Sequence, residues 1–132
     1  MKFNIKIFEK VPIIGILRNI NEETVKSLLP VYFKSGFNSV EITMNSPRAA
    51  EIIQNSVKDF PKMNIGAGTV CTMEELDLAC DAGASFIVSP ILSSEIIKKS
   101  IERKVAVFPG VLTPTEIFKA HSLGASAIKV FP

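Results

Sequence analysis

Short apolar runs alternate with amphipathic stretches along this chain. Each run is continuous rather than interrupted by polar residues, which is typical of strands that are covered on both faces. Between the runs, apolar side chains recur at the spacing of one helix face. Val25, Leu28 and Leu29 begin the first such stripe, and Tyr32 and Phe33 continue it. We therefore expect strands over residues 11–17, 39–44, 64–70, 86–90, 105–108 and 127–132, with helices between them and a short amphipathic segment over residues 4–10 in front.

Capping signals indicate where the helices begin and end. The expected N-caps are Asn21, Ser46, Thr72 and Thr113. Glu75 and Glu116 lie three residues after their caps and complete two capping boxes. Pro47 suits the first position of the helix that Ser46 would cap. The residues expected to end helices are Gly36, Pro61, Gly83 and Gly124.

The element order is strand–helix repeated five times, followed by a last strand. Strict alternation with short loops predicts right-handed crossovers and a parallel sheet. A doubly wound open sheet would suit the length, but it usually carries a glycine-rich turn after its first strand. Here Gly15 lies inside that strand, and Arg18-Asn19-Ile20 follows it. We therefore favour one α/β domain over residues 1–132, a (β/α)8 TIM barrel of parallel strands that stops after its sixth strand.

Composition narrows the function classes. The 132 residues are 47% hydrophobic and 21% charged, which suits a globular domain, and the formal net charge is only +2. No basic footprint for nucleic acid is present, and no apolar run approaches the roughly 18 residues of a membrane span. The first residues lack the apolar core of a signal peptide. These features predict a cytoplasmic protein without nucleic-acid or membrane partners.

The cysteine and histidine content limits the chemistry further. Cys71 and Cys80 are nine positions apart, which matches no metal or redox motif, and we expect reduced thiols. His121 is the only histidine and lies on an expected helix. A zinc site or a histidine-based catalytic triad is therefore excluded.

Two charged residues fall inside otherwise apolar strands. Glu41 lies in the second expected strand and Lys129 in the last. A buried lysine either pairs with a carboxylate or loses its proton, and a neutral amine attacks carbonyl carbons to form Schiff bases. A catalytic pair is one interpretation. A structural ion pair is the other, and the residue spacing does not decide between them.

Other polar residues end the expected strands, where barrel enzymes place their active sites. Arg18 follows the first strand and could bind a carboxylate through two hydrogen bonds, or it could be a surface residue. Thr43, Thr69 and Ser89 occupy equivalent places in later strands. The glycines of Gly66-Ala67-Gly68-Thr69 indicate either a ligand close to the backbone or only tight packing.

An ordered series of motifs resembles the 2-keto-3-deoxy-6-phosphogluconate (KDPG) aldolase family, which includes 4-hydroxy-2-oxoglutarate aldolases and a phosphogalactonate branch. The resemblance covers about residues 11–132, and its motifs are specific as a set rather than singly. They are Leu17-Arg18, Val40-Glu41-Ile42-Thr43, Gly66-Ala67-Gly68-Thr69-Val70, Ser89-Pro90, Pro109-Gly110-Val111, Thr113-Pro114-Thr115-Glu116 and Lys129-Val130-Phe131-Pro132.

The resemblance implies a metal-free class I aldolase that needs no cofactor beyond its Schiff-base lysine and is usually a homotrimer. Lys129 matches that lysine, Glu41 the general acid/base, and Thr69 a threonine of the pyruvate pocket. Arg18 matches an arginine that some members use there. Other members carry an arginine at the position of Asn45, which leaves Arg18 as the expected carboxylate ligand.

The expected substrate is a 2-keto-4-hydroxy acid, cleaved to pyruvate and either glyceraldehyde 3-phosphate or glyoxylate. We also expect Asn45, Ser89 and Pro90 to bind substrate. Asn45-Ser46-Pro47 looks more like the phosphogalactonate branch, so 2-dehydro-3-deoxy-6-phosphogalactonate is an alternative substrate.

The short length leaves a second class of hypothesis open. Family members extend well beyond the lysine, and five and a half units cannot close a barrel. The chain is either a portion of an active aldolase or an inactive remnant that serves as an oligomer or interaction module. In both cases we expect open sheet edges and no well-packed monomer.

Overall fold

The computed structural model describes residues 2–132, in which a parallel sheet forms the scaffold. Neighbouring strands follow one another in sequence, β1-β2-β3-β4-β5. This order confirms the barrel topology over the doubly wound one, in which the first strand lies inside the sheet with later strands on both sides. The strands are β1 (Gly15–Leu17), β2 (Ser39–Thr43), β3 (Asn64–Gly68), β4 (Phe86–Val88) and β5 (Ala106–Phe108).

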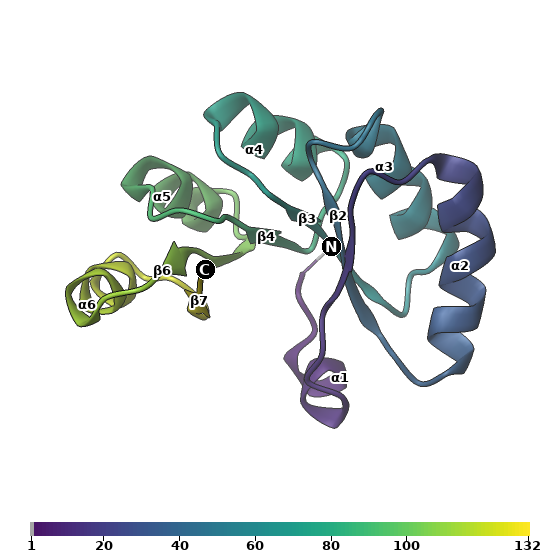
Figure 1. Ribbon diagram of the computed structural model, residues 1–132, viewed down its shortest axis with the longest axis horizontal. Coiled ribbons are helices and arrows are strands. Elements are labelled where there is room, and N and C mark those ends of the chain that lie inside the picture. Colours follow the sequence, from purple (N-terminus) through teal and green to yellow (C-terminus); the bar gives the residue numbers. More distant parts are fainter. Residues whose placement is uncertain (1) are drawn as a thin grey trace.

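The helices give the sheet an outer and an inner face. Helices α2 to α6 lie in an arc outside the strands, whereas α1 (Ile5–Lys10) lies on the opposite side (Figure 1). None of the helices in residues 2–132 has the length and apolarity to cross a membrane. The outer helices are α2 (Glu22–Lys34), α3 (Ala49–Asp59), α4 (Met73–Asp81), α5 (Ser94–Glu102) and α6 (Pro114–Ser122).

The end of the chain runs beside the fifth strand, as expected for a sixth. β7 (Lys129–Val130) pairs in parallel with β6 (Gly110–Val111), and Ser126 donates its amide to the carbonyl of Val107 in β5 (2.9 Å). Pro109 separates β5 from β6, because proline has no N–H to donate to the ladder. The carbonyl of Pro109 still accepts the Lys129 amide (3.0 Å), which keeps the last segment in line.

The last strand is not buried, contrary to the sequence-based expectation. Val130 is 67% exposed and Phe131 42% exposed, and Lys129 is only partly buried. Within the described residues, β7 pairs on one side only, with β6, so its second edge and inner face lack a covering element. Apolar sequence therefore predicted the strand correctly and its burial wrongly.

Several boundaries also differ from the expected ones, most of them by a shorter strand. The first strand covers Gly15–Leu17 rather than residues 11–17. Ser46 does not cap α3; Arg48, in a left-handed conformation (φ 55°), is the N-cap, and the helix begins at Ala49. The amide of Ser46 instead closes a turn on the carbonyl of Thr43 (2.9 Å). The other three expected caps and both capping boxes are confirmed.

The main core lies between the strands and the outer helices. Its fully buried side chains include Leu29, Ile42, Ile52, Ile53, Ile65, Leu76, Ile87 and Ile97. A second, aromatic cluster lies apart from this core. The Phe3 ring meets Phe86 and Phe108 edge-on, with ring centres 5.4 Å apart in each pair. Gly66 leaves room for Phe86, since a Cβ at that glycine would come within 2.5 Å of the ring.

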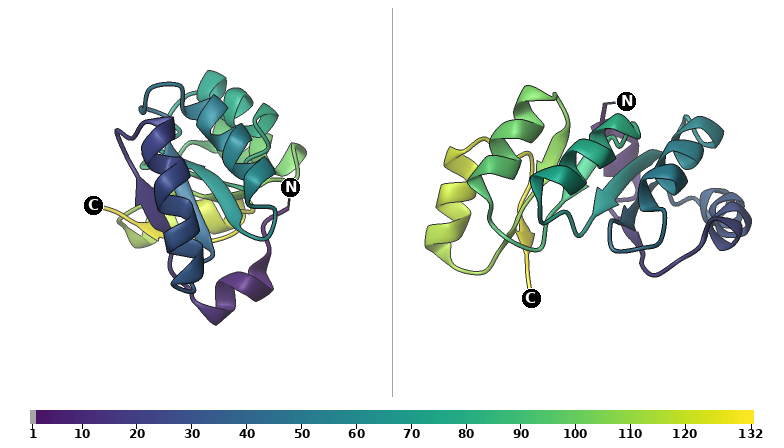
Figure 2. Two further views of the ribbon diagram at one scale, coloured as in Figure 1. Left: turned by 90° about the vertical axis from the view of Figure 1, so that its right-hand side faces the viewer. Right: turned by 90° about the horizontal axis from the view of Figure 1, so that it is seen from above.

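The N-terminal segment covers the end of the sheet at which the strands begin. The backbone of Asn4 exchanges hydrogen bonds of 2.7 and 3.1 Å with the side chain of Asn64, the first residue of β3. The first described residues and the C-terminus lie on opposite sides of the molecule when it is seen from above (Figure 2). Residues 2–10 therefore lie at the end of the sheet where the strands begin. The carboxyl ends of the strands lie at the opposite end.

Candidate active site

Glu41 is a buried carboxylate without a complete set of partners. It lies in the middle of β2, is 2% exposed, and its Oε1 has no hydrogen-bond partner. The neighbouring strand provides the space for it. A Cβ on Gly68 would stand 2.3 Å from Oε1, so only glycine fits there without displacing the carboxyl group. This local arrangement is costly for folding, which favours a functional reason for it.

Burial raises the pKa of the Glu41 carboxyl above its ordinary value, and the positive charges of Lys129 and Arg18 partly oppose that rise. Desolvation outweighs the attraction of the two positive charges, because burial excludes water from the carboxyl. Among the described residues, no ion pair joins Glu41 to either cation. The structural ion pair that the sequence left open is therefore not formed.

Glu41 and Lys129 line the same cavity, whose volume is about 490 Å³. Its walls are otherwise almost entirely apolar and come from the N-terminal segment, β1, β5 and the segment before β7; Ser126 is the other polar residue on the wall. The Lys129 ammonium group also lies over the ring of Phe131, 4.7 Å from its centre, a cation–π contact. The two charged groups therefore share one largely apolar cavity.

Arg18 is near enough to Glu41 for its charge to act on the carboxyl, although it does not line the cavity. It follows β1 directly and is exposed. The adjoining Asn19 has a left-handed backbone (φ 51°), and its amide donates to the Ser46 hydroxyl (3.0 Å). The loop after β1 is thereby tied to the turn after β2.

The remaining expected site residues lie at the ends of their strands but do not line the cavity of Glu41 and Lys129. Thr69 follows β3 with a left-handed backbone (φ 57°), a conformation that non-glycine residues adopt mainly where the surroundings enforce it. Asn45 is exposed in the turn after β2. Ser89 is buried, and its hydroxyl accepts the Ile91 amide (3.3 Å). Pro90 borders a separate groove together with Phe131.

Sequence reasoning missed the roles of Gly68 and Ser46. The two glycines of β3 are two positions apart, and β3 pairs with β2 so that Gly66 faces Glu41 and Gly68 faces Thr43. That period of two was a usable signal for space on the face that carries Glu41.

Within residues 2–132, no three His, Cys, Asp or Glu side chains are grouped to hold a metal ion.

Comparisons with known proteins identify similar chains. The family model described as KDPG and KHG aldolase matches residues 5–132. The 2-dehydro-3-deoxy-6-phosphogalactonate aldolase of Escherichia coli K12 is 38% identical over 93% of this chain and 60% of its own length. This chain thus spans about 60% of the length of such curated relatives.

Solved structures give the same picture. A native KDPGal structure superposes with a TM-score of 0.90 and 36% identity, covering 100% of this chain and 63% of the other. A KDPG aldolase from Legionella pneumophila, with pyruvate captured at low pH as a covalent carbinolamine intermediate, gives 0.87 and 28% identity over 96% and 61%.

Proposed function

The chain belongs to the KDPG and KHG aldolase family, and from this premise we propose that it carries a class I aldolase site that cleaves a 2-keto-4-hydroxy acid to pyruvate and an aldehyde. The observation that carries the proposal is the buried, incompletely hydrogen-bonded carboxylate of Glu41 on the same cavity as Lys129. Schiff-base chemistry requires a lysine amine and a group that transfers protons. The carboxyl of Glu41, whose pKa is raised, can serve as that group.

In this proposal Lys129 is the nucleophile. After it has given up a proton, its Nζ attacks the C2 carbonyl of the 2-keto acid to form a carbinolamine, which loses water to give a protonated imine. The electron pair of the C3–C4 bond then moves into this cation and leaves an enamine. The C3 carbon of the enamine takes up a proton, and water hydrolyses the resulting imine to pyruvate and free lysine. No metal or organic cofactor enters these steps.

Glu41 moves the protons. It takes the proton of the C4 hydroxyl, directly or through a water molecule, as the aldehyde leaves. A carboxyl with an ordinary pKa would be a weak base at neutral pH, and burial raises the pKa of Glu41 in the required direction. Gly68 makes room for the carboxyl in this position, because a side chain there would collide with it.

The ends of the strands would bind the rest of the substrate. Arg18 is exposed directly after β1 and is proposed to bind the substrate carboxylate. Thr69, Asn45, Ser89 and Pro90 are proposed as further contacts at the same end of the sheet.

The expected substrate is 2-keto-3-deoxy-6-phosphogluconate, which yields glyceraldehyde 3-phosphate, or a hydroxy-oxoglutarate that yields glyoxylate. Relatives named for the phosphogalactonate reaction keep 2-dehydro-3-deoxy-6-phosphogalactonate as the alternative. We further propose a cytoplasmic homotrimer as the working form.

A non-catalytic interaction module is the second candidate function. The observation that favours it is the exposure of large apolar side chains on the inner face and the last strand, among them Ile16 at 52% and Val130. Such surface normally binds another protein.

Borohydride trapping separates the two functions. The chain is incubated with pyruvate, reduced, and its intact mass measured beside Lys129→Ala and the matched control Lys119→Ala, which removes an exposed lysine of α6. We expect one reduced pyruvyl adduct in the unmodified chain and in the control, and none in Lys129→Ala. An adduct that persists in Lys129→Ala would overturn the assignment of the nucleophile. No adduct in a folded, unmodified sample would favour the interaction module.

A further inference from the structure

Two buried hydroxyl groups connect the loops that carry Arg18 and Asn45. Thr43 ends β2 and is fully buried, and Ser46 is 5% exposed in the turn that follows. Their hydroxyl oxygens are 3.2 Å apart. Thr43 Oγ1 also lies 3.3 Å from the carbonyl oxygen of Leu17, and Ser46 Oγ lies 3.0 Å from the amide of Asn19.

The direction of each hydrogen bond follows from the groups involved. A carbonyl can only accept, so the single hydroxyl proton of Thr43 goes to Leu17. Ser46 must then donate its proton to Thr43 Oγ1, and its lone pairs accept the amide of Asn19. All the polar groups of this chain of bonds are satisfied in one arrangement only, which makes it a rigid connection.

This connection holds both neighbours of Arg18. Leu17 and Asn19 are each bonded to the hydroxyl pair, so the backbone at residue 18 is fixed from either side. The bond to Ser46 also supports the left-handed backbone of Asn19 (φ 51°), a conformation that non-glycine residues adopt mainly where their surroundings enforce it. Asn45 is held in the same way, because the Ser46 amide closes the turn on the Thr43 carbonyl (2.9 Å).

We propose that Ser46, together with Thr43, is a positioning residue that orients Arg18 towards the carboxylate of the substrate. The inference rests on the proposed aldolase function, since it assigns a purpose to the loop that would bind the 2-keto acid. Neither hydroxyl lines the cavity of Glu41 and Lys129, so both act through the loop and not on the reacting atoms.

The test is the pyruvate concentration that gives half-maximal borohydride trapping at Lys129. We expect Ser46→Ala to raise it about tenfold, because small misplacements of a carboxylate ligand weaken binding strongly, while the maximal amount of adduct stays the same. Trapping of hydroxyacetone, a ketone without a carboxylate, should not change. Thr43→Val, which removes the other hydroxyl at nearly constant volume, should reproduce the effect if Ser46→Ala folds poorly.

Two further variants make the test specific. Ser85→Ala removes a buried hydroxyl that donates to the Ile65 carbonyl (2.9 Å) at the other end of the sheet, and it should leave the pyruvate dependence unchanged. In an Arg18→Met background, Ser46→Ala should add little, because the residue it positions is gone.

The possible results distinguish the positioning role of Ser46 from the proposed aldolase function. An unchanged pyruvate dependence in Ser46→Ala and Thr43→Val, an equal loss with hydroxyacetone, or full additivity with Arg18→Met would overturn the positioning role alone. No adduct in the folded, unmodified chain would overturn the proposed function and the positioning role with it.

Discussion

At the scale of single residues, the sequence marks Glu41 and Lys129 as unusual, and the structure shows how differently they are placed. Glu41 is enclosed, with an unpartnered Oε1, whereas Lys129 is partly exposed and rests against Phe131. Burying an ionised carboxylate without a full set of hydrogen bonds destabilises a fold. We therefore expect Glu41 to lower the stability of the fold when its carboxyl is ionised.

The buried carboxyl of Glu41 should make the free energy of unfolding depend on pH. The folded-state pKa of Glu41 is raised above the ordinary 4.5. The folded state then binds more protons than the unfolded state above that pH, so the carboxyl lowers the free energy of unfolding as the pH rises from 4.5 towards the folded pKa. Glu41→Gln cannot ionise and should be more stable than the unmodified chain by about 1–3 kcal/mol near pH 7.

Urea unfolding at about pH 4 and about pH 7 measures the difference. The gain should be small at the lower pH, where the carboxyl is protonated in the folded state and mostly protonated in the unfolded state. An equal gain at both values would show that the ionised form is not the source of the destabilisation.

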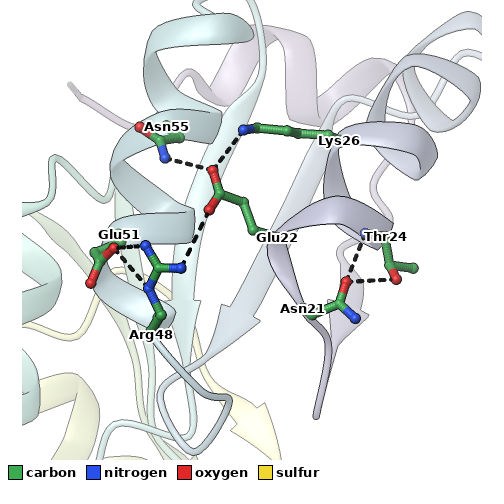
Figure 3. A network of polar contacts seen from close by, with 7 residues as sticks. All are labelled: Asn21, Glu22, Thr24, Lys26, Arg48, Glu51 and Asn55. Carbon is green, nitrogen blue, oxygen red and sulfur yellow. Dashed lines mark hydrogen bonds and ion pairs between the residues drawn. The ribbon is translucent and has the colours of Figure 1, made fainter.

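At the scale of elements, one carboxylate joins two of the outer helices. Glu22, at the start of α2, accepts hydrogen bonds from Lys26 on its own helix and from Asn55 on α3, at 2.7 and 2.9 Å (Figure 3). Arg48, the N-cap of α3, lies 3.9 Å from the same carboxylate and also binds Glu51. This network fixes α3 against α2. Its Arg48 lies two positions after Ser46 in the chain.

A pair of substitutions isolates its contribution. Glu22→Ala removes the interhelical bonds, whereas Glu23→Ala removes a neighbouring, exposed acid from the same first turn. Both variants lose a favourable interaction with the dipole of α2. The difference between their free energies of unfolding therefore measures the contribution of the network. We expect Glu22→Ala to lose about 0.5–1.5 kcal/mol more in the free energy of unfolding.

Salt provides the control for this prediction. The excess loss should shrink in about 1 M salt, because partly exposed charges are screened there. Equal losses for the two variants in dilute buffer would mean that the network does not stabilise the fold.

At the scale of the whole molecule, helices α2 to α6 cover the outer face of the strands and leave much of the inner face open (Figure 1). Ile16 pairs in register with Glu41 and borders the same cavity. Together with Val130 and Phe131, it exposes apolar surface that soluble monomers rarely carry. The expectation that this chain alone is not a well-packed monomer stays a prediction.

Sedimentation equilibrium tests it. We expect a mass above that of the monomer at micromolar concentration, and a smaller mass for Ile16→Lys, which places a charge on the inner face. Ile101→Lys is the matched control, since Ile101 is 44% exposed but lies on α5, outside the sheet. A monomeric mass with a sharp unfolding transition would contradict the prediction.

The sequence by itself determined the class and order of the elements. Apolar runs, helix stripes and caps such as Asn21 and Thr113 are local signals, and they predicted the alternation of strands and helices that the sheet order β1 to β5 confirms. It also singled out Glu41 and Lys129, because a charge in an apolar strand is visible without any tertiary contact. The family resemblance rests on the same local motifs.

Only the tertiary structure decided how these residues meet. The strand register places Gly68 where its missing side chain makes room for the Glu41 carboxyl. The hydroxyl of Ser46, expected to cap a helix, instead bonds the amide of Asn19, 27 positions away in the chain. Exposure of the last strand depends on which neighbours cover it, not on its composition. These outcomes are set by contacts between segments distant in sequence, which a local pattern cannot encode.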